Sequence, residues 1–230
     1  MRMVCMGTIV TVASGKGGVG KTTVVILLAT TLAKRMRVAV IDADPNRRFT
    51  EWAGLYEGPA ITVRPETDTA RLASLPRKLA AEHDVVLLDI AGFGSQALVV
   101  AVAAANGVLI PTKSDRGSVL EAAATAELTG GMASTIGREI PCRIITVAFD
   151  ERLRADAYAL DQIRDLGLTR AQSGLRNRTG YKGVTWSGSV PSLGPIAVEG
   201  ESLADELISL GWVPARSGTD YQPVLQQPIS

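Results

Sequence analysis

The chain has 230 residues, of which 46% are hydrophobic and 20% are charged, and its formal net charge is +1. This length and composition indicate a soluble, globular chain that can form one α/β domain with a substantial core. The near-neutral charge excludes a protein that attracts polyanions over its whole surface, so any nucleic-acid binding must come from a local basic patch.

Strand and helix patterns alternate along the chain, which is typical of parallel strands joined by crossover helices. Apolar, β-branched runs predict strands over residues 8–14, 37–42, 61–64, 84–89, 107–111, 143–149 and, less regularly, 168–171. Apolar residues at helical spacing predict helices over residues 24–35, 70–82, 97–105, 118–133, 154–166 and 201–210. The polar, basic segment 176–186 is expected on the surface, as a helix or a loop.

We therefore expect the α/β class, with a doubly wound, mostly parallel sheet. A single domain would occupy residues 1–212, and the proline-containing residues 213–230 are expected to form a disordered tail. The longest apolar stretch, residues 97–105, is too short to cross a bilayer. Cys5 and Cys142 lie far apart and form no metal-binding spacing, so they are expected to be reduced thiols of a cytoplasmic protein.

A phosphate-binding loop follows the first predicted strand. Gly15, Gly20, Lys21 and Thr22 fit the pattern of Gly, four residues, Gly-Lys-Ser/Thr, and a helical segment follows them. Backbone N–H groups of such a loop converge on phosphate, its lysine reaches the β- and γ-phosphates, and its hydroxyl ligates Mg²⁺. The motif therefore predicts ATP and Mg²⁺ as ligands. The expected nucleotide-binding residues are Gly15, Lys16, Gly17, Gly18, Val19, Gly20, Lys21, Thr22 and Thr23.

Lys16, a second lysine at the front of the loop, is not needed to hold a nucleotide within one chain. It is explained if it reaches into the site of a partner chain, so the sequence favours a homodimer that forms on ATP binding.

Acidic residues end two of the predicted strands. Asp89 closes the most hydrophobic strand and is placed as a Walker B acid that holds Mg²⁺. Asp42 and Asp44 are two positions apart, so both point the same way in extended backbone, and either could orient or deprotonate an attacking water. Gly92 and Gly94 follow closely and either supply a γ-phosphate contact or form a tight turn.

These motifs together resemble the ParA/MinD family of deviant Walker A ATPases. Residues 16–22 match its KGGxGK[ST] form, residues 42–45 match its Asp-x-Asp-Pro motif, and Asp89 matches its Walker B acid. The resemblance spans roughly residues 7–210. It implies a P-loop NTPase fold of the SIMIBI type, with slow, partner-stimulated ATP hydrolysis. It also implies that Lys16 contacts nucleotide across a sandwich dimer, that Asp44 positions the hydrolytic water, and that Thr22, Asp42 and Asp89 serve Mg²⁺.

Within the family, the chain is similar to small plasmid-type ParA proteins and to the VirC-type ATPase of T-DNA transfer, on residues 46–52 and 89–95. We expect an ATPase switch that binds non-specific DNA on the nucleoid and partitions a plasmid or related cargo with a ParB-type, centromere-binding adaptor. Recruitment of a conjugative-transfer complex and positioning of a protein cargo are the alternatives. A metabolic ligase similar to dethiobiotin synthetase is an alternative of another class. The acidic last helix argues against a membrane partner.

The resemblance implies a DNA-binding surface, and one short stretch, which is nearly free of acidic residues, can supply it. Arg170, Arg176, Arg178 and Lys182 lie there beside aromatic residues and are the predicted phosphate contacts. A solvated basic face is the alternative explanation of the same cluster.

Overall fold

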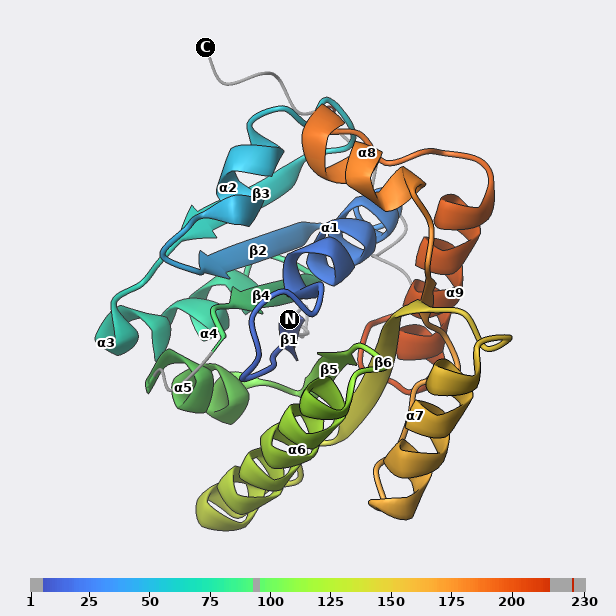
Figure 1. The fold of residues 1–230 in the computed structure, drawn as a ribbon. Coiled ribbons are helices and arrows are strands. Elements are labelled where there is room, and N and C mark those ends of the chain that lie inside the picture. Colours follow the sequence, from blue (N-terminus) through green and yellow to red (C-terminus); the bar gives the residue numbers. More distant parts are fainter. Residues whose placement is uncertain (1–5, 93–95, 216–224, 226–230) are drawn as a thin grey trace.

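A computed structural model of the chain describes residues 6–92, 96–215 and 225. Within these residues, seven parallel strands form one sheet with helices on both faces (Figure 1). Their order across the sheet is β3 (Ile61–Pro65), β2 (Val38–Ala43), β4 (Val85–Ile90), β1 (Thr8–Val12), β5 (Gly107–Thr112), β6 (Cys142–Phe149) and β7 (Leu175–Arg176). The order reverses at β1, which is where ligands bind in open parallel sheets.

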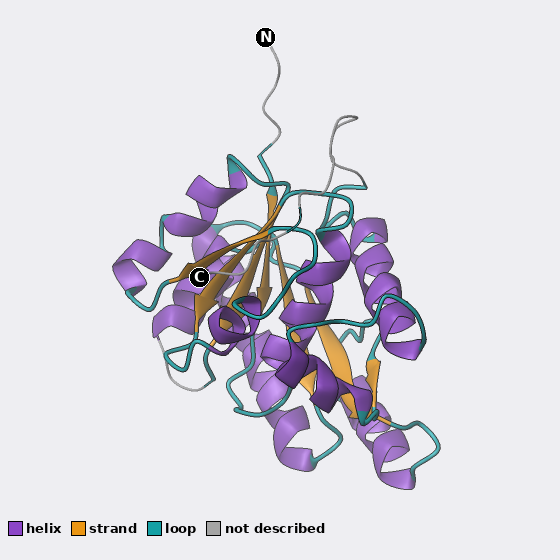
Figure 2. Cartoon of the chain, turned by 90° about the horizontal axis from the view of Figure 1, so that it is seen from above, coloured by secondary structure: helices purple, strands orange, loops and turns teal. Residues whose placement is uncertain are grey.

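Two layers of helices enclose this sheet, as the view from above shows (Figure 2). One face is covered by α1 (Lys21–Leu32), α2 (Arg48–Ala53), α8 (Gly180–Ser187) and α9 (Pro195–Ser209). The other face is covered by α3 (Thr69–Leu72), α4 (Leu75–Ala80), α5 (Gln96–Ala104), α6 (Arg116–Ile136) and α7 (Arg154–Asp165).

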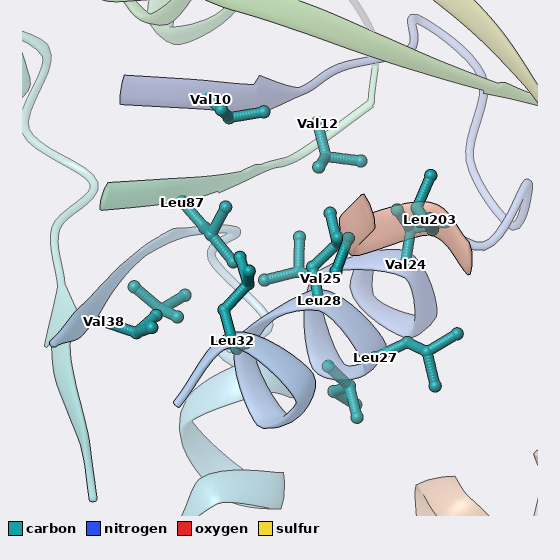
Figure 3. Packing of buried hydrophobic residues seen from close by; sticks show 14 of the residues in the cluster. Val10, Val12, Val24, Val25, Leu27, Leu28, Leu32, Val38, Leu87 and Leu203 are labelled. Carbon is teal, nitrogen blue, oxygen red and sulfur yellow. The ribbon is translucent and has the colours of Figure 1, made fainter. Parts of the chain in front are cut away.

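The strands are apolar throughout because both of their faces are buried. Alternate side chains enter different cores. Val10 and Val12 of β1 pack beneath α1 (Figure 3). Ile9 belongs to the cluster on the opposite face. α1 is buried on nearly every side, since the sheet lies on one side of it and α9 on another. Gly200 of α9 permits this contact, because a Cβ there would lie 2.8 Å from Thr31 Oγ1.

The expected fold class and the six main strands are confirmed, with ends shifted by one or two residues. Three segments need correction. The helix expected over residues 70–82 is split into α3 and α4, since Pro76 lies in the first turn of α4 and restarts the helix there. The strand expected over residues 168–171 forms only an isolated bridge from Arg170 to Ile144, and the seventh strand lies later, at β7. α9 begins at Pro195, six residues before the predicted start.

The short helix α2 was not predicted by the sequence pattern. It buries Phe49, Trp52 and Ala53 in the core, and its Thr50 donates a hydrogen bond to Asp42 near the end of β2. The expected tail lies mostly outside the described residues, although Val213 at its start is buried in the core. Helices long and apolar enough to traverse a bilayer do not occur in the described part of the chain.

Candidate functional site

The phosphate-binding loop connects the end of β1 to the start of α1, as the motif requires. Gly18 and Gly20 have φ values of 74° and 97°, in the left-handed region that favours glycine. A Cβ on Gly20 would also lie 2.8 Å from Val147 Cγ1 of β6, so the loop is packed against the sheet. The backbone is therefore shaped so that N–H groups of the loop and of the first turn of α1 face a common space.

Gly92 lies against this loop. A Cβ there would be 3.1 Å from the amide nitrogen of Gly17, so a larger residue would press on the loop backbone. The segment after β4 is therefore close enough to respond to what the loop holds. The other glycine of this segment, Gly94, lies outside the described residues.

Lys21, the first residue of α1, is 7% exposed, and its Nζ donates to the carbonyl oxygen of Lys16 at 2.8 Å. Burial lowers the pKa of Lys21, and the nearby Asp89 and Asp44 oppose that shift, whereas Arg48 adds to it. A buried ammonium that caps the loop's own backbone is placed to exchange this hydrogen bond for a phosphate oxygen.

Asp89 lies at the end of β4, directly beside Asp42 of β2 in the sheet register. Its side chain is 1% exposed and contacts the Thr22 hydroxyl, and its Oδ2 has no hydrogen-bond partner among the described residues. Burial raises the pKa of Asp89 to about 7, the Thr22 hydrogen bond opposes this, and Asp42 adds to it. A buried carboxylate oxygen without a hydrogen-bond donor is energetically unfavourable, and a bound cation would stabilise it.

These residues fit a magnesium ion. Clusters of three His, Cys, Asp or Glu side chains able to hold a metal are absent from the part of the chain that the structure describes. Mg²⁺ does not need such a cage, because it keeps several waters and binds one or two protein oxygens together with substrate phosphates. Thr22 and Asp89 would supply those oxygens, and the ion would neutralise phosphate charge.

Unlike Asp89, Asp42 has hydrogen-bond donors on both of its carboxylate oxygens. Its Oδ2 accepts hydrogen bonds from the Thr50 amide at 2.8 Å and the Thr50 hydroxyl at 2.7 Å, and its Oδ1 accepts from the Asp44 amide at 3.2 Å. The buried carboxylate thus ties α2 to the end of β2. A role in Mg²⁺ binding remains a prediction for this residue.

Asp44 is half-buried and borders the same space as the loop. Its Oδ1 accepts hydrogen bonds from the amide and side chain of Asn46, both at 2.9 Å, which leaves Oδ2 available. The structure thereby separates the two acids that spacing alone left equivalent: Asp42 is bonded to Thr50, whereas Asp44 faces the cavity.

Lys16 points away from that space and toward α6. Its Nζ donates to Asp115 Oδ1 at 2.5 Å and to Ser118 Oγ at 3.0 Å, and its side chain is 36% exposed. The lysine holds the pKa of Asp115 well below its usual range, and Ser118 contributes to the same shift. The two lysines of the loop therefore have different surroundings, one inside the nucleotide cavity and the other at the surface.

The cavity has a volume of about 940 Å³ and is lined by the loop, by Asp44–Asn46, by one face of α2 and by Gly92. Thr185 and Trp186 of α8 also line it, the latter 83% exposed. The sequence did not predict α2 or α8 as cavity walls, because neither carries a phosphate-binding pattern. Asp115 could have been found, since an acid that follows a predicted strand and precedes Ser118 by three positions is typical of a helix N-cap.

The predicted DNA contacts lie around β7 and α8, and folding places acids beside them. Arg178 Nε donates to Glu199 Oε1 of α9 at 2.6 Å, and Arg170 lies 4.0 Å from Glu151. Arg176 and Lys182 are exposed. Residues 170–186 contain no acidic residue, but the fold brings acidic side chains from elsewhere beside Arg170 and Arg178. Arg176 and Lys182 are therefore the most available cations of this stretch.

Comparison with protein-family models matches residues 10–167 to the family described as the CobQ/CobB/MinD/ParA nucleotide binding domain. The chain belongs to this family. The match covers the loop, both acidic strand ends and the sheet out to β6, so the expected resemblance to ParA and MinD, which are P-loop ATPases, is confirmed.

Individual relatives agree with this assignment. The protein ParA of Rhizobium radiobacter is 30% identical over 152 residues, which is 65% of this chain and 68% of the relative. The maintenance of carboxysome distribution protein A of Gloeobacter kilaueensis is 38% identical over 107 residues, 45% of this chain and 48% of that protein. The apo structure of McdA from Cyanothece superposes with a TM-score of 0.76 over 87% of this chain and 99% of the other, at 18% identity, which shows a shared fold.

Proposed function

We propose that this family member is an ATP-dependent dimerising switch that binds DNA non-specifically and moves a plasmid or related cargo with a partner protein. In this proposal ATP and Mg²⁺ occupy the cavity, with Lys21 on the phosphates and Thr22 and Asp89 on the ion. Asp44 positions the water that attacks the terminal phosphate. Hydrolysis then releases the dimer.

The orientation of Lys16 is the observation that carries the proposal. This residue lies outside the cavity that its own loop forms, whereas Lys21 of the same loop lines that cavity. A lysine on a nucleotide-binding loop that is not directed to its own site is available for a site in a second chain. The bond to Asp115 is exposed, and exposed ion pairs are worth little, about 0–1 kcal/mol, so ATP-driven dimerisation can replace it.

The DNA and cargo parts of the proposal are supported by the relatives. The 30%-identical Rhizobium radiobacter protein is named ParA, and Arg176 and Lys182 offer exposed cations. We infer a cytoplasmic, nucleoid-associated protein whose adaptor is of the centromere-binding type.

Retention of the protein on non-specific duplex DNA tests the proposal. With ATP and Mg²⁺ the protein should bind, and the affinity should fall steeply as salt rises, because phosphate contacts release counterions. With ADP, binding should be much weaker. Equal binding with ATP, ADP and no nucleotide would contradict an ATP-controlled DNA switch.

Positioning of a protein cargo is the second candidate, favoured by the similarity to the carboxysome distribution protein. It uses the same ATP and DNA cycle, so the two differ in the partner that stimulates hydrolysis. A metabolic ligase of the dethiobiotin-synthetase type would instead turn over rapidly with a small acceptor and show no response to DNA.

A further inference from the structure

One face of α2 borders the nucleotide cavity and carries a cation that the family motifs do not use. Arg48, Glu51 and, in the turn after the helix, Leu55 are spaced i, i+3 and i+7, and all three line the cavity. Phe49 faces the opposite way and is fully buried in the core. The helix is therefore fixed in rotation, with Arg48 on the side of the phosphate-binding loop.

The backbone beneath Arg48 is held in place. The Thr50 amide and hydroxyl both donate to the buried Asp42, and the Arg47 amide donates to the Asp44 carbonyl at 2.8 Å. Arg47 itself has a φ of 49°, a left-handed conformation that is unfavourable for arginine. The hydrogen bonds around Arg47 hold it in this strained conformation, so the turn before α2 has a fixed geometry.

The charge of Arg48 acts on Lys21 of the phosphate-binding loop. Burial is the main cause that lowers the pKa of Lys21, Asp89 and Asp44 oppose the shift, and Arg48 adds a smaller contribution to it. Arg48 is exposed, and its guanidinium forms no ion pair with any residue that the structure describes. Its N–H donors are therefore available to an anion that enters the cavity.

We propose that Arg48 binds the terminal phosphate of ATP and thereby lets the protein distinguish ATP from ADP. The loop amides and Lys21 bind the β-phosphate and one side of the γ-phosphate, and Arg48, four residues after Asp44, lines the same cavity from α2 and adds a second cation for the γ-phosphate. The planar fork of a guanidinium matches two phosphate oxygens, and this match explains an arginine rather than a lysine at the position. This inference rests on the proposed ATP switch and identifies the element that senses its state.

Isothermal titration calorimetry with Mg²⁺ and either ATPγS or ADP tests the assignment. Arg48→Ala should weaken ATPγS binding by about tenfold or more, the scale of a lost charge-assisted contact, and change ADP affinity by less than about twofold. Arg48→Lys should retain part of the preference, since it keeps the charge without the fork. Arg47→Ala is the matched control: it removes the same charge from the adjacent exposed position and keeps a Cβ on the strained turn.

Two results would overturn the inference: an unchanged ATPγS-to-ADP preference in Arg48→Ala, or an equal loss of that preference in Arg47→Ala. Failure of the proposed function would differ, because wild-type protein would then bind neither nucleotide, or would bind both with Lys21→Ala showing the same affinities.

Discussion

At the scale of single residues, the unusual state of Asp89 has a measurable consequence. Its folded-state pKa of about 7 lies above the unfolded value, so the folded protein binds the extra proton between roughly pH 4 and pH 7. The stability that this raised pKa contributes is fully present below about pH 4 and is lost as the pH rises to about 7. A buried carboxylate without a donor on Oδ2 therefore destabilises the nucleotide-free protein at neutral pH.

Asp89→Asn should remove this penalty. In the absence of nucleotide and Mg²⁺, thermal unfolding should show a gain over wild type that is larger at pH 8 than at pH 5 by at least about 1 kcal/mol, or roughly 2–4 °C in Tm. Asp161→Asn, at an exposed position of α7, is the control and should show no such trend. A gain of the same size at both pH values would mean that Asp89 ionises normally in the folded protein.

The place of a residue in the fold could be predicted from the sequence where it depends on one contiguous motif or one strand. The loop, Lys21 and Thr22 are contiguous, and Asp89 ends a strand whose pattern is unmistakable. The contact between Lys16 and Asp115 joins positions 99 apart, and the Asp42–Thr50 bonds depend on the turn that starts α2. Neither could be predicted from periodicity, because both depend on how elements pack together.

At the scale of elements, length decided what could be predicted. β1, β2, β4 and β5 are buried on both faces and long enough to show their character. α2 has six residues and β7 has two, which is too short for a periodic pattern to emerge. The structural role of α2, as a wall of the nucleotide cavity, was therefore found only in the fold.

The segment that contains β7 and α8 should carry the DNA contacts. Arg176→Ala combined with Lys182→Ala removes two exposed cations but leaves Arg178 on Glu199, so α9 keeps its partner. We expect affinity for non-specific DNA to fall by about tenfold or more, and the salt dependence to become shallower by roughly two per chain, with ATPase activity retained.

The matched control for this pair is Arg154→Ala combined with Arg164→Ala on α7, which makes the same change in net charge at exposed positions. A fluorescence-anisotropy titration at several salt concentrations measures both affinity and slope. Equal losses in the two double variants would indicate a general charge effect and would exclude this segment as a specific DNA surface.

At the scale of the whole molecule, the alternation of strands and helices was enough to predict a parallel, doubly wound sheet. The order of the strands was not encoded in any local pattern, yet it is the order that brings the ends of β1, β2 and β4 together. That convergence gives one chain a nearly complete nucleotide site. The exception is Lys16, which lies outside the site and is the residue on which the proposed second chain depends.

The molar mass of the ATP complex tests this most directly, measured by light scattering on Asp44→Ala, which should bind ATP without hydrolysing it. With ATP and Mg²⁺ we expect the mass of two 24.2 kDa chains, and with Lys16→Ala added to Asp44→Ala we expect the mass of one. Lys21→Ala should stay at one chain because it cannot hold the nucleotide. An ATP complex that remains a single chain, or a dimer unaffected by the loss of Lys16, would contradict the account.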